Sequence, residues 1–593
     1  MTSLLLALPL IAGAQTQAPD TAYFKQGVEY RIEASLDEAT SVLSARARLH
    51  YTNRSSRRID TLYFHLHLNA FRPTSAWAGR ELESDNRRFQ DLGPLDHAYE
   101  RLKSVTVAGQ PVTPLFPGAP DSTVAAVPLP APLGPGDVVS VRIDWDARLS
   151  TLPRRQGRRG RHYDFAQWYP KIAVFDRGGW QVQPLMPQGE FYGEFASFDV
   201  TLEVGTDQVI GATGVPVDGD PGWLAKRAPG SAEPVLDRDA YPAKSAEPLG
   251  LLGTPPATGR KRVRWRAEQV HHFAWSMDPA YIHEGGAYDN VTIHVLYLPP
   301  DTAWRDVAVE RTRAALAFMD TIFGPFPWPQ LTNVHRIEDG GTEFPMLIMD
   351  GSAAERLIVH EVAHNYVMGV LANNEWRQGW LDEGFAQFLT NWYSERRGLD
   401  EKTVWADAME SIRSMERAGR TQPIALPSAA FRDFGTYTAM TYTKPSLIYR
   451  MLRHMLGEET FRRGLRLYYE RSGLRHVREE DLRAALEEAA GRDLRWFFLQ
   501  WIHTTATLDY SVTAARTREL ADGMWETTVD VTREGEAFMP VTLKVGEEIR
   551  RLESRAPTQT VTVRTATRPA QVVLDPDNVL IDIQPQNNRM DVR

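Results

Sequence analysis

Residues 357–367 have the sequence LIVHEVAHNYV, which places two histidines four positions apart within an apolar run. In a helix, His360 and His364 lie one turn apart on the same face and point toward one place. Glu361 lies about a hundred degrees around the same helix. The spacing of apolar residues predicts a helix over about 352–371, beginning at a capping-box pattern, Ser352 followed by Glu355.

A catalytic zinc ion needs three protein ligands and one open position for water. The chain has no cysteine, so its metal ligands must be histidines and carboxylates. After eighteen residues that follow His364, Glu383 of the stretch WLDEGFA (380–386) stands at the start of a second helical pattern. We therefore predict that His360, His364 and Glu383 bind zinc and that Glu361 is the general base.

The alternative to a zinc site is a solvated helix face with polar neighbours, because a bare HExxH motif fixes only three positions. Here the flanking residues are apolar and a carboxylate follows in its own helix. These two features favour the zinc site.

On either side of this region the periodicity changes. Further helical patterns cover 304–323, 382–397, 444–456, 459–472 and 479–502. Short alternating segments such as 30–34, 46–51 and 139–143 predict strands, and 216–258 is typical of a long surface loop. Strand patterns return after about residue 508. We expect a multidomain α+β fold: an N-terminal antiparallel β-domain (19–270), a mainly α catalytic domain (271–506) and a small C-terminal β-sandwich (507–593).

Composition narrows the class of protein. The 593 residues are 42% hydrophobic and 24% charged, which is typical of soluble globular chains with packed cores. The formal net charge is -9 and no domain is strongly basic, so a nucleic-acid partner is not expected. The sequence indicates no particular oligomeric state.

The N-terminal residues resemble an export signal. Residues 4–14 form a short apolar run that ends in Ala12-Gly13-Ala14, a small-residue pattern like a secretory cleavage site. We expect residues 1–18 to be a signal peptide and the protein to be periplasmic or secreted. The run is too short to span a bilayer, and we expect no integral membrane segment.

The motif HEVAH, eighteen residues and then the glutamate of WLDEGFA resembles the M1 family of zinc metallopeptidases, gluzincins related to aminopeptidase N. The resemblance implies one zinc ion per chain, peptide substrates, a saddle-like N-terminal β-domain and a thermolysin-like catalytic domain. It also implies that Tyr442, in a stretch similar to the family's Tyr-x-Lys element, stabilises the oxyanion.

Gly340-Gly341-Thr342-Glu343-Phe344 resembles the family's Gly-x-Met-Glu-Asn strand. The resemblance implies that Gly340 and Gly341 bind the substrate backbone and that Glu343 holds its free α-amine. Thr342 and Phe344 depart from that pattern. Thr390 stands where the family often has a carboxylate that orients a zinc-binding histidine, so Asp382 or Glu375 is expected to replace it.

These features predict an aminopeptidase. Two alternatives stay open: an endopeptidase or oligopeptidase of the same fold, and a catalytically silent binding module, whose signature would be degenerate metal ligands. The arginines of 154–161 form either a solvated loop, the usual reading, or a basic loop that attracts acidic peptides to the cleft.

Overall fold

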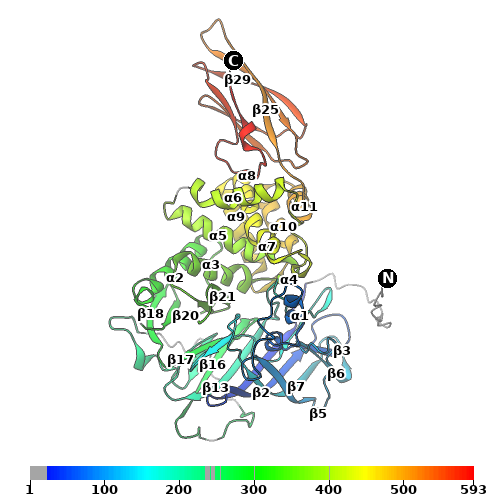
Figure 1. The fold of residues 1–593 in the computed structure, drawn as a ribbon, viewed down its shortest axis with the longest axis vertical. Helices are drawn as coiled ribbons and strands as arrows, with labels where there is room; N and C mark the ends of the chain where they lie inside the picture. The colour runs from blue at the N-terminus through cyan, green and yellow to red at the C-terminus, as the bar shows by residue number, and fades with distance from the viewer. Residues whose placement is uncertain are drawn as a thin grey trace.

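The computed structural model describes residues 23–233, 241, 247–253, 255–299, 301–399 and 401–592. The expected signal peptide at 1–18 lies outside these residues. Figure 1 shows three successive parts: β-sheets of the N-terminal half at one end, a layer of helices in the middle, and C-terminal β-sheets at the other end. The predicted multidomain α+β class is confirmed.

The main sheet of the N-terminal part has eight strands in the order β15-β16-β13-β1-β2-β7-β4-β5. Neighbours are antiparallel except β1 and β13, which pair in parallel. Alternate residues of β2 are buried, as a strand with one face on a core requires. The strands are β1 (Gly27–Asp37), β2 (Val42–Thr52), β4 (Tyr99–Val107), β5 (Gln110–Pro111), β7 (Val138–Arg148), β13 (Ala196–Gly205), β15 (Val215–Asp218) and β16 (Arg260–Val270).

Three smaller sheets complete this part, with strand orders β10-β3-β6, β11-β12 and β14-β17-β9-β8. Their strands are β3 (Ile59–His65), β6 (Val124–Leu133), β8 (Gly157–Arg159), β9 (His162–Phe165), β10 (Lys171–Ile172), β11 (Val174–Asp176), β12 (Gly179–Gln181), β14 (Val209–Ala212) and β17 (Trp275–Asp278). A short helix, α1 (Ala76–Leu82), lies between β3 and β4. Within the predicted loop 216–258, the described residues after β15 contain one 3-10 turn, Leu224–Lys226.

The catalytic region begins with a five-stranded sheet in the order β18-β19-β20-β22-β21. Its strands are β18 (Ile282–Tyr288), β19 (Val291–Tyr297), β20 (Gln330–His335), β21 (Gly341–Phe344) and β22 (Leu347–Asp350). The sheet is mixed: β19, β20 and β22 run parallel, and β18 and β21 are antiparallel edges. The helical layer packs on it through α2 and α3.

Most of the helices agree with the predicted patterns. They are α2 (Thr302–Ile322), α3 (Glu355–His364), α4 (Glu375–Gln378), α5 (Glu383–Arg396), α6 (Glu401–Arg417), α7 (Phe434–Thr438), α8 (Lys444–Leu456), α9 (Glu458–Ser472), α10 (Glu479–Ala490) and α11 (Arg495–His503). The helix predicted over 352–371 is α3 followed by a π-helical segment, Asn365–Val370. It begins at Glu355 without a side-chain cap, so the predicted capping box does not form. No described helix is both long enough and apolar enough to cross a bilayer.

The C-terminal part has two sheets, β25-β26-β29 and β28-β27-β30-β31. The strands are β25 (Tyr510–Glu519), β26 (Trp525–Arg533), β27 (Val541–Val545), β28 (Glu548–Leu552), β29 (Thr558–Thr565), β30 (Gln571–Leu574) and β31 (Arg589–Asp591). Polar contacts join it to the helices: Gln500 of α11 exchanges two hydrogen bonds with the backbone of Phe538, and Arg413 of α6 bonds the Leu580 carbonyl.

Candidate active site

Three of the predicted ligand atoms converge at the junction of α3 and α5. The Nε2 atoms of His360 and His364 are 3.1 Å apart, and Glu383 Oε2 lies 3.3 Å and 3.1 Å from them. A triangle of this size can be coordinated by one ion at roughly 2 Å from each atom, the distance that zinc prefers. Two imidazole nitrogens and a carboxylate oxygen are ligand types that zinc prefers, so the donor set fits zinc.

Asp382 orients one of the histidines. Its Oδ1 lies 2.7 Å from His364 Nδ1, and the carboxylate is fully buried. This contact directs the other ring nitrogen, Nε2, toward Glu383. Of the two candidates left open by the sequence, Asp382 therefore makes the orienting contact, and Glu375 does not touch either histidine.

Glu361 is buried beside the strand β21. Its Oε2 has no hydrogen-bond partner among the described residues, and burial raises the pKa of this carboxyl well above its usual range. A β-carbon added to Gly341 would lie only 2.0 Å from Glu361 Oε1. Gly341 therefore has a structural reason to be glycine: it leaves room for the predicted base. Its neighbour Gly340 has φ +77°, a conformation that favours glycine.

Asn365, in the π-helical segment after α3, ties that helix to the end of β21. Its Oδ1 accepts a hydrogen bond from the Met346 N–H at 2.9 Å, and its Nδ2 bonds the Glu361 carbonyl at 3.3 Å. The helix that carries the base and the strand that carries Glu343 are thus fixed relative to each other.

Tyr442 lies in a second π-helical segment, Ala439–Thr443, between α7 and α8. Its hydroxyl donates a hydrogen bond to Glu383 Oε1 at 2.5 Å. Lys444, two residues later, forms a buried ion pair with Glu416 at 3.0 Å, which fixes the start of α8. The structure therefore brings the predicted oxyanion donor to the metal ligands.

A group of three buried carboxylates lies beside the metal ligands. Glu343 joins Glu190 and Glu375, and one oxygen of each lies within 4.8 Å of the others. We call these three residues the carboxylate cradle. All three are at most 6% exposed. Glu375 begins α4 and accepts the Phe191 N–H at 3.1 Å.

Glu190 was not predicted from the sequence. It lies in the segment between β12 and β13, more than 150 residues before β21. The signal in the sequence is the stretch QGEFYGEF (188–195), in which two glutamates stand among aromatic residues. Aromatic residues tend to be buried, and a glutamate buried with them is rare unless it has a partner.

Arg155 enters the cradle from the basic loop. Its guanidinium hydrogen-bonds Glu190 and lies 3.9 Å from Glu343 Oε1. Arg154, the preceding residue, pairs instead with Glu338 at 3.3 Å. The interpretation of the whole run as a solvated loop is therefore wrong for Arg155, whose side chain is 18% exposed, although Arg159 is exposed.

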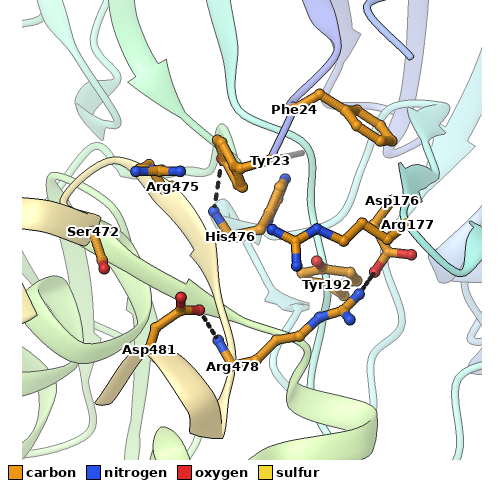
Figure 2. Close-up of a pocket in the computed structure, with 10 residues that line it drawn as sticks. All are labelled: Tyr23, Phe24, Asp176, Arg177, Tyr192, Ser472, Arg475, His476, Arg478 and Asp481. Carbon is orange, nitrogen blue, oxygen red and sulfur yellow. Dashed lines mark hydrogen bonds and ion pairs between the residues drawn. The ribbon is translucent and has the colours of Figure 1, made fainter. Parts of the chain in front are cut away.

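A separate pocket of about 50 Å³ lies between the N-terminal sheets and the catalytic region (Figure 2). Tyr192 and Asp176 line it from one side, and His476 and Arg478 from the other. Arg478 pairs with Asp176 at 3.2 Å across it. None of the predicted site residues lines this pocket, so it is part of the interface and not of the zinc site.

Comparisons agree with this geometry. Residues 346–501 match the peptidase family M1 domain. Aminopeptidase 2, mitochondrial, of Saccharomyces cerevisiae is 29% identical over 236 residues, which are 36% of this chain and 25% of that protein. Aminopeptidase N of Caulobacter vibrioides is 30% identical over 171 residues, 28% of this chain and 20% of that protein.

Two solved structures share the fold. An M1 zinc metallopeptidase from Deinococcus radiodurans superposes with a TM-score of 0.56 at 16% identity, covering 82% of this chain and 96% of that one. Legionella pneumophila aminopeptidase A in complex with aspartic acid gives 0.64 at 14% identity, covering 95% of this chain and 60% of that one.

The fold and the three zinc ligands define the catalytic domain of a zinc metallopeptidase. Over residues 346–501 the chain carries the domain of an M1 family zinc metallopeptidase. It aligns with only about a quarter of the length of the yeast relative.

Proposed function

We propose that the protein is an aminopeptidase that removes N-terminal residues from peptides. The observation that carries this proposal is the carboxylate cradle directly beside the zinc ligands. A cluster of buried carboxylates with spare acceptor oxygens is suited to a substrate's α-ammonium group. An ammonium held there would bring the first peptide bond, and no later one, to the metal.

The residues of the chain have distinct parts in the proposed reaction. The three ligands would hold zinc, which would supply a Lewis acid for the peptide carbonyl and for the attacking water. Glu361 accepts the proton of the attacking water and passes it to the leaving amine. Tyr442 donates its hydroxyl hydrogen bond to the oxygen on which negative charge develops. Asp382 keeps His364 in the tautomer that presents Nε2 to the metal.

The two departures from the family strand do not weaken the amine site. Thr342 and Phe344 flank Glu343 on β21, and successive strand residues point to opposite faces. Both are almost fully buried, and Thr342 bonds Arg336. The altered side chains therefore lie on the face turned away from Glu343.

The test compares peptides with a free and an acetylated N-terminus, using the wild type and Glu343→Ala with bound zinc quantified. We expect acetylation to abolish cleavage, and Glu343→Ala to raise KM for free-amine peptides while zinc stays bound. Equal cleavage of acetylated peptides would instead identify an endopeptidase. No cleavage of any peptide by the zinc-loaded protein would identify a silent binding module.

We also propose that the protein is exported, on the strength of the signal-like pattern in residues 4–14. Fractionation of expressing cells, with mass spectrometry of the mature N-terminus, tests this. Recovery of the uncleaved chain in the cytoplasm would contradict it.

A further inference from the structure

Both hydrogen-bond donors and hydrogen-bond acceptors lack partners in and beside the cradle. Arg155 has five N–H donors, yet among the described residues its side chain donates a hydrogen bond only to Glu190. Glu190 Oε2 is buried and accepts no hydrogen bond, and the Glu343 carboxylate accepts none from any described residue. The site therefore has spare acceptors for a cation and, beside them, spare donors for an anion.

Contacts of both its backbone and its side chain fix the position of Arg155 beside the cradle. Its N–H donates to Glu338 Oε2 at 2.6 Å, and its guanidinium lies 5.5 Å from the centre of the Phe191 ring. The residue has φ +58°, which a non-glycine residue adopts at a cost. The side chain reaches the cradle, where its charge interacts with those of Glu190, Glu343 and, more weakly, Glu383.

We propose that Arg155 binds the side-chain carboxylate of the substrate's first residue, so that the site selects peptides beginning with Asp or Glu. This inference rests on the proposed aminopeptidase function. An N-terminal acidic residue carries an ammonium and a carboxylate a few ångströms apart. The structure offers receptors of matching sign and spacing, since Arg155 Nη1 and Glu343 Oε1 are 3.9 Å apart.

The selectivity follows from pairing charges in a site that the bound substrate closes to water. A neutral first residue leaves the guanidinium donors without acceptors, and unmatched buried donors cost binding free energy. A basic first residue places a second cation beside Arg155. An acidic residue lets the ammonium take the free oxygens of Glu190 and Glu343 while the planar guanidinium binds the new carboxylate, in the geometry that arginine prefers.

The test measures kcat/KM for three peptides that differ only in the first residue: Glu, Gln or Lys. For the wild type we expect the Glu peptide to be cleaved about tenfold or more faster than the Gln peptide. In Arg155→Gln this ratio falls to about one, chiefly through the Glu peptide. Arg155→Lys, which keeps the charge but not the planar fork, gives an intermediate ratio.

Arg154→Gln is the matched control. It removes the same charge from the adjacent position of the same loop, but its guanidinium pairs with Glu338 and not with the cradle. We expect it to keep the wild-type ratio of Glu to Gln cleavage. Zinc content and melting temperature establish that each variant is folded.

Two results would overturn the inference: a Glu to Gln ratio that Arg155→Gln leaves unchanged, or a rise in kcat/KM on all three peptides alike. The second would mean that Arg155 merely competes with the substrate's ammonium.

A separate measurement does not need turnover: the thermal shift of the zinc-loaded wild type with free glutamate, glutamine or lysine. Glutamate must give the largest shift. Cleavage of acetylated peptides refutes the aminopeptidase proposal, whereas free-amine cleavage without acid preference refutes only the role of Arg155.

Discussion

At the scale of single residues, Glu361 is the group whose surroundings are most informative. It is packed against Gly341 and has one carboxylate oxygen with no hydrogen-bond partner among the described residues. Glutamine keeps the size of this side chain but cannot accept the proton. We expect Glu361→Gln to bind zinc normally and to lower kcat by about 10²–10⁴-fold. Metal analysis and steady-state kinetics measure both quantities, and His360→Ala, which removes a ligand, is the control that loses zinc. Near-normal turnover in Glu361→Gln would disprove its role as the base.

Asp382 and Glu375 allow a second prediction, because both are buried acids near the metal ligands. Only Asp382 contacts His364, at 2.7 Å. We expect Asp382→Asn to weaken zinc binding by about 10–100-fold, since a neutral amide supports the imidazole less well than a carboxylate. Glu375→Gln should leave zinc affinity unchanged and should raise KM for free-amine peptides. Competition with a chromogenic chelator measures the affinities. Equal losses of zinc in the two variants would contradict the assignment.

The sequence predicts local parts of the site better than distant ones. His360, His364 and Glu383 lie within 24 residues, so helical spacing alone brings two of them together. Glu190 meets Glu343 only because the segment after β12 packs against β21. No periodicity in the sequence predicts that contact. The position of Arg155 could not be predicted either, because it stands in a run whose composition is typical of a solvated loop.

At the scale of elements, the bounds of four helices, α2, α5, α8 and α9, were predicted to within a few residues. The amphipathic helix α6 was not predicted, and two further kinds of element were missed. The strands β19 and β22 are short, mainly apolar runs, and β18 and β20 carry polar residues or glycine without regular alternation, all within a region whose longer patterns are helical. The π-helical segments next to His364 and around Tyr442 require tertiary contacts such as the Asn365 bridge, which a local pattern does not contain.

The pattern predicted as one helix over 479–502 is two helices, α10 and α11, separated near Gly491. Gly491 has φ +64° and ends α10 in the left-handed conformation, with open space around its α-carbon. The cost of a side chain there comes from the backbone alone, about 1 kcal/mol. We expect Gly491→Ala to lower the melting temperature of the catalytic region by a few degrees at most.

Gly79 is the control for this prediction, because it lies within α1 and also has no atoms near an added β-carbon. There alanine favours the helix, so Gly79→Ala should leave the melting temperature unchanged or raise it. Calorimetry of both variants makes the comparison. A drop for Gly79→Ala equal to that for Gly491→Ala would show that the left-handed backbone is not the cause.

At the scale of the whole molecule, the N-terminal sheets and the catalytic region meet through a buried polar network. Asp164 of β9 accepts the Ile337 N–H at 3.1 Å, and Tyr281 donates to the His335 carbonyl at 2.7 Å. His162 lies within the network, 3.0 Å from Asp164 and 3.1 Å from Asp278. Because a buried histidine contacts two carboxylates here, we expect the stability of the interface to depend on pH.

The last prediction follows from the charge of His162. Burial by itself lowers the pKa of this imidazole, but the neighbouring carboxylates of Asp164 and Asp278 outweigh burial and raise the pKa to about 9. The folded pKa is therefore above the unfolded value of about 6.5. The stabilisation is fully present below pH 6.5 and is lost as the pH rises through 9.

We expect His162→Gln to lower the melting temperature most near pH 6, and by much less near pH 9.5. The pKa of Asp164 is lowered in the fold, so its own contribution is lost only at acid pH. Melting temperatures of wild type and variant at several pH values give the difference directly, and a difference independent of pH between 6 and 9.5 would show that the imidazole is not charged in the folded protein.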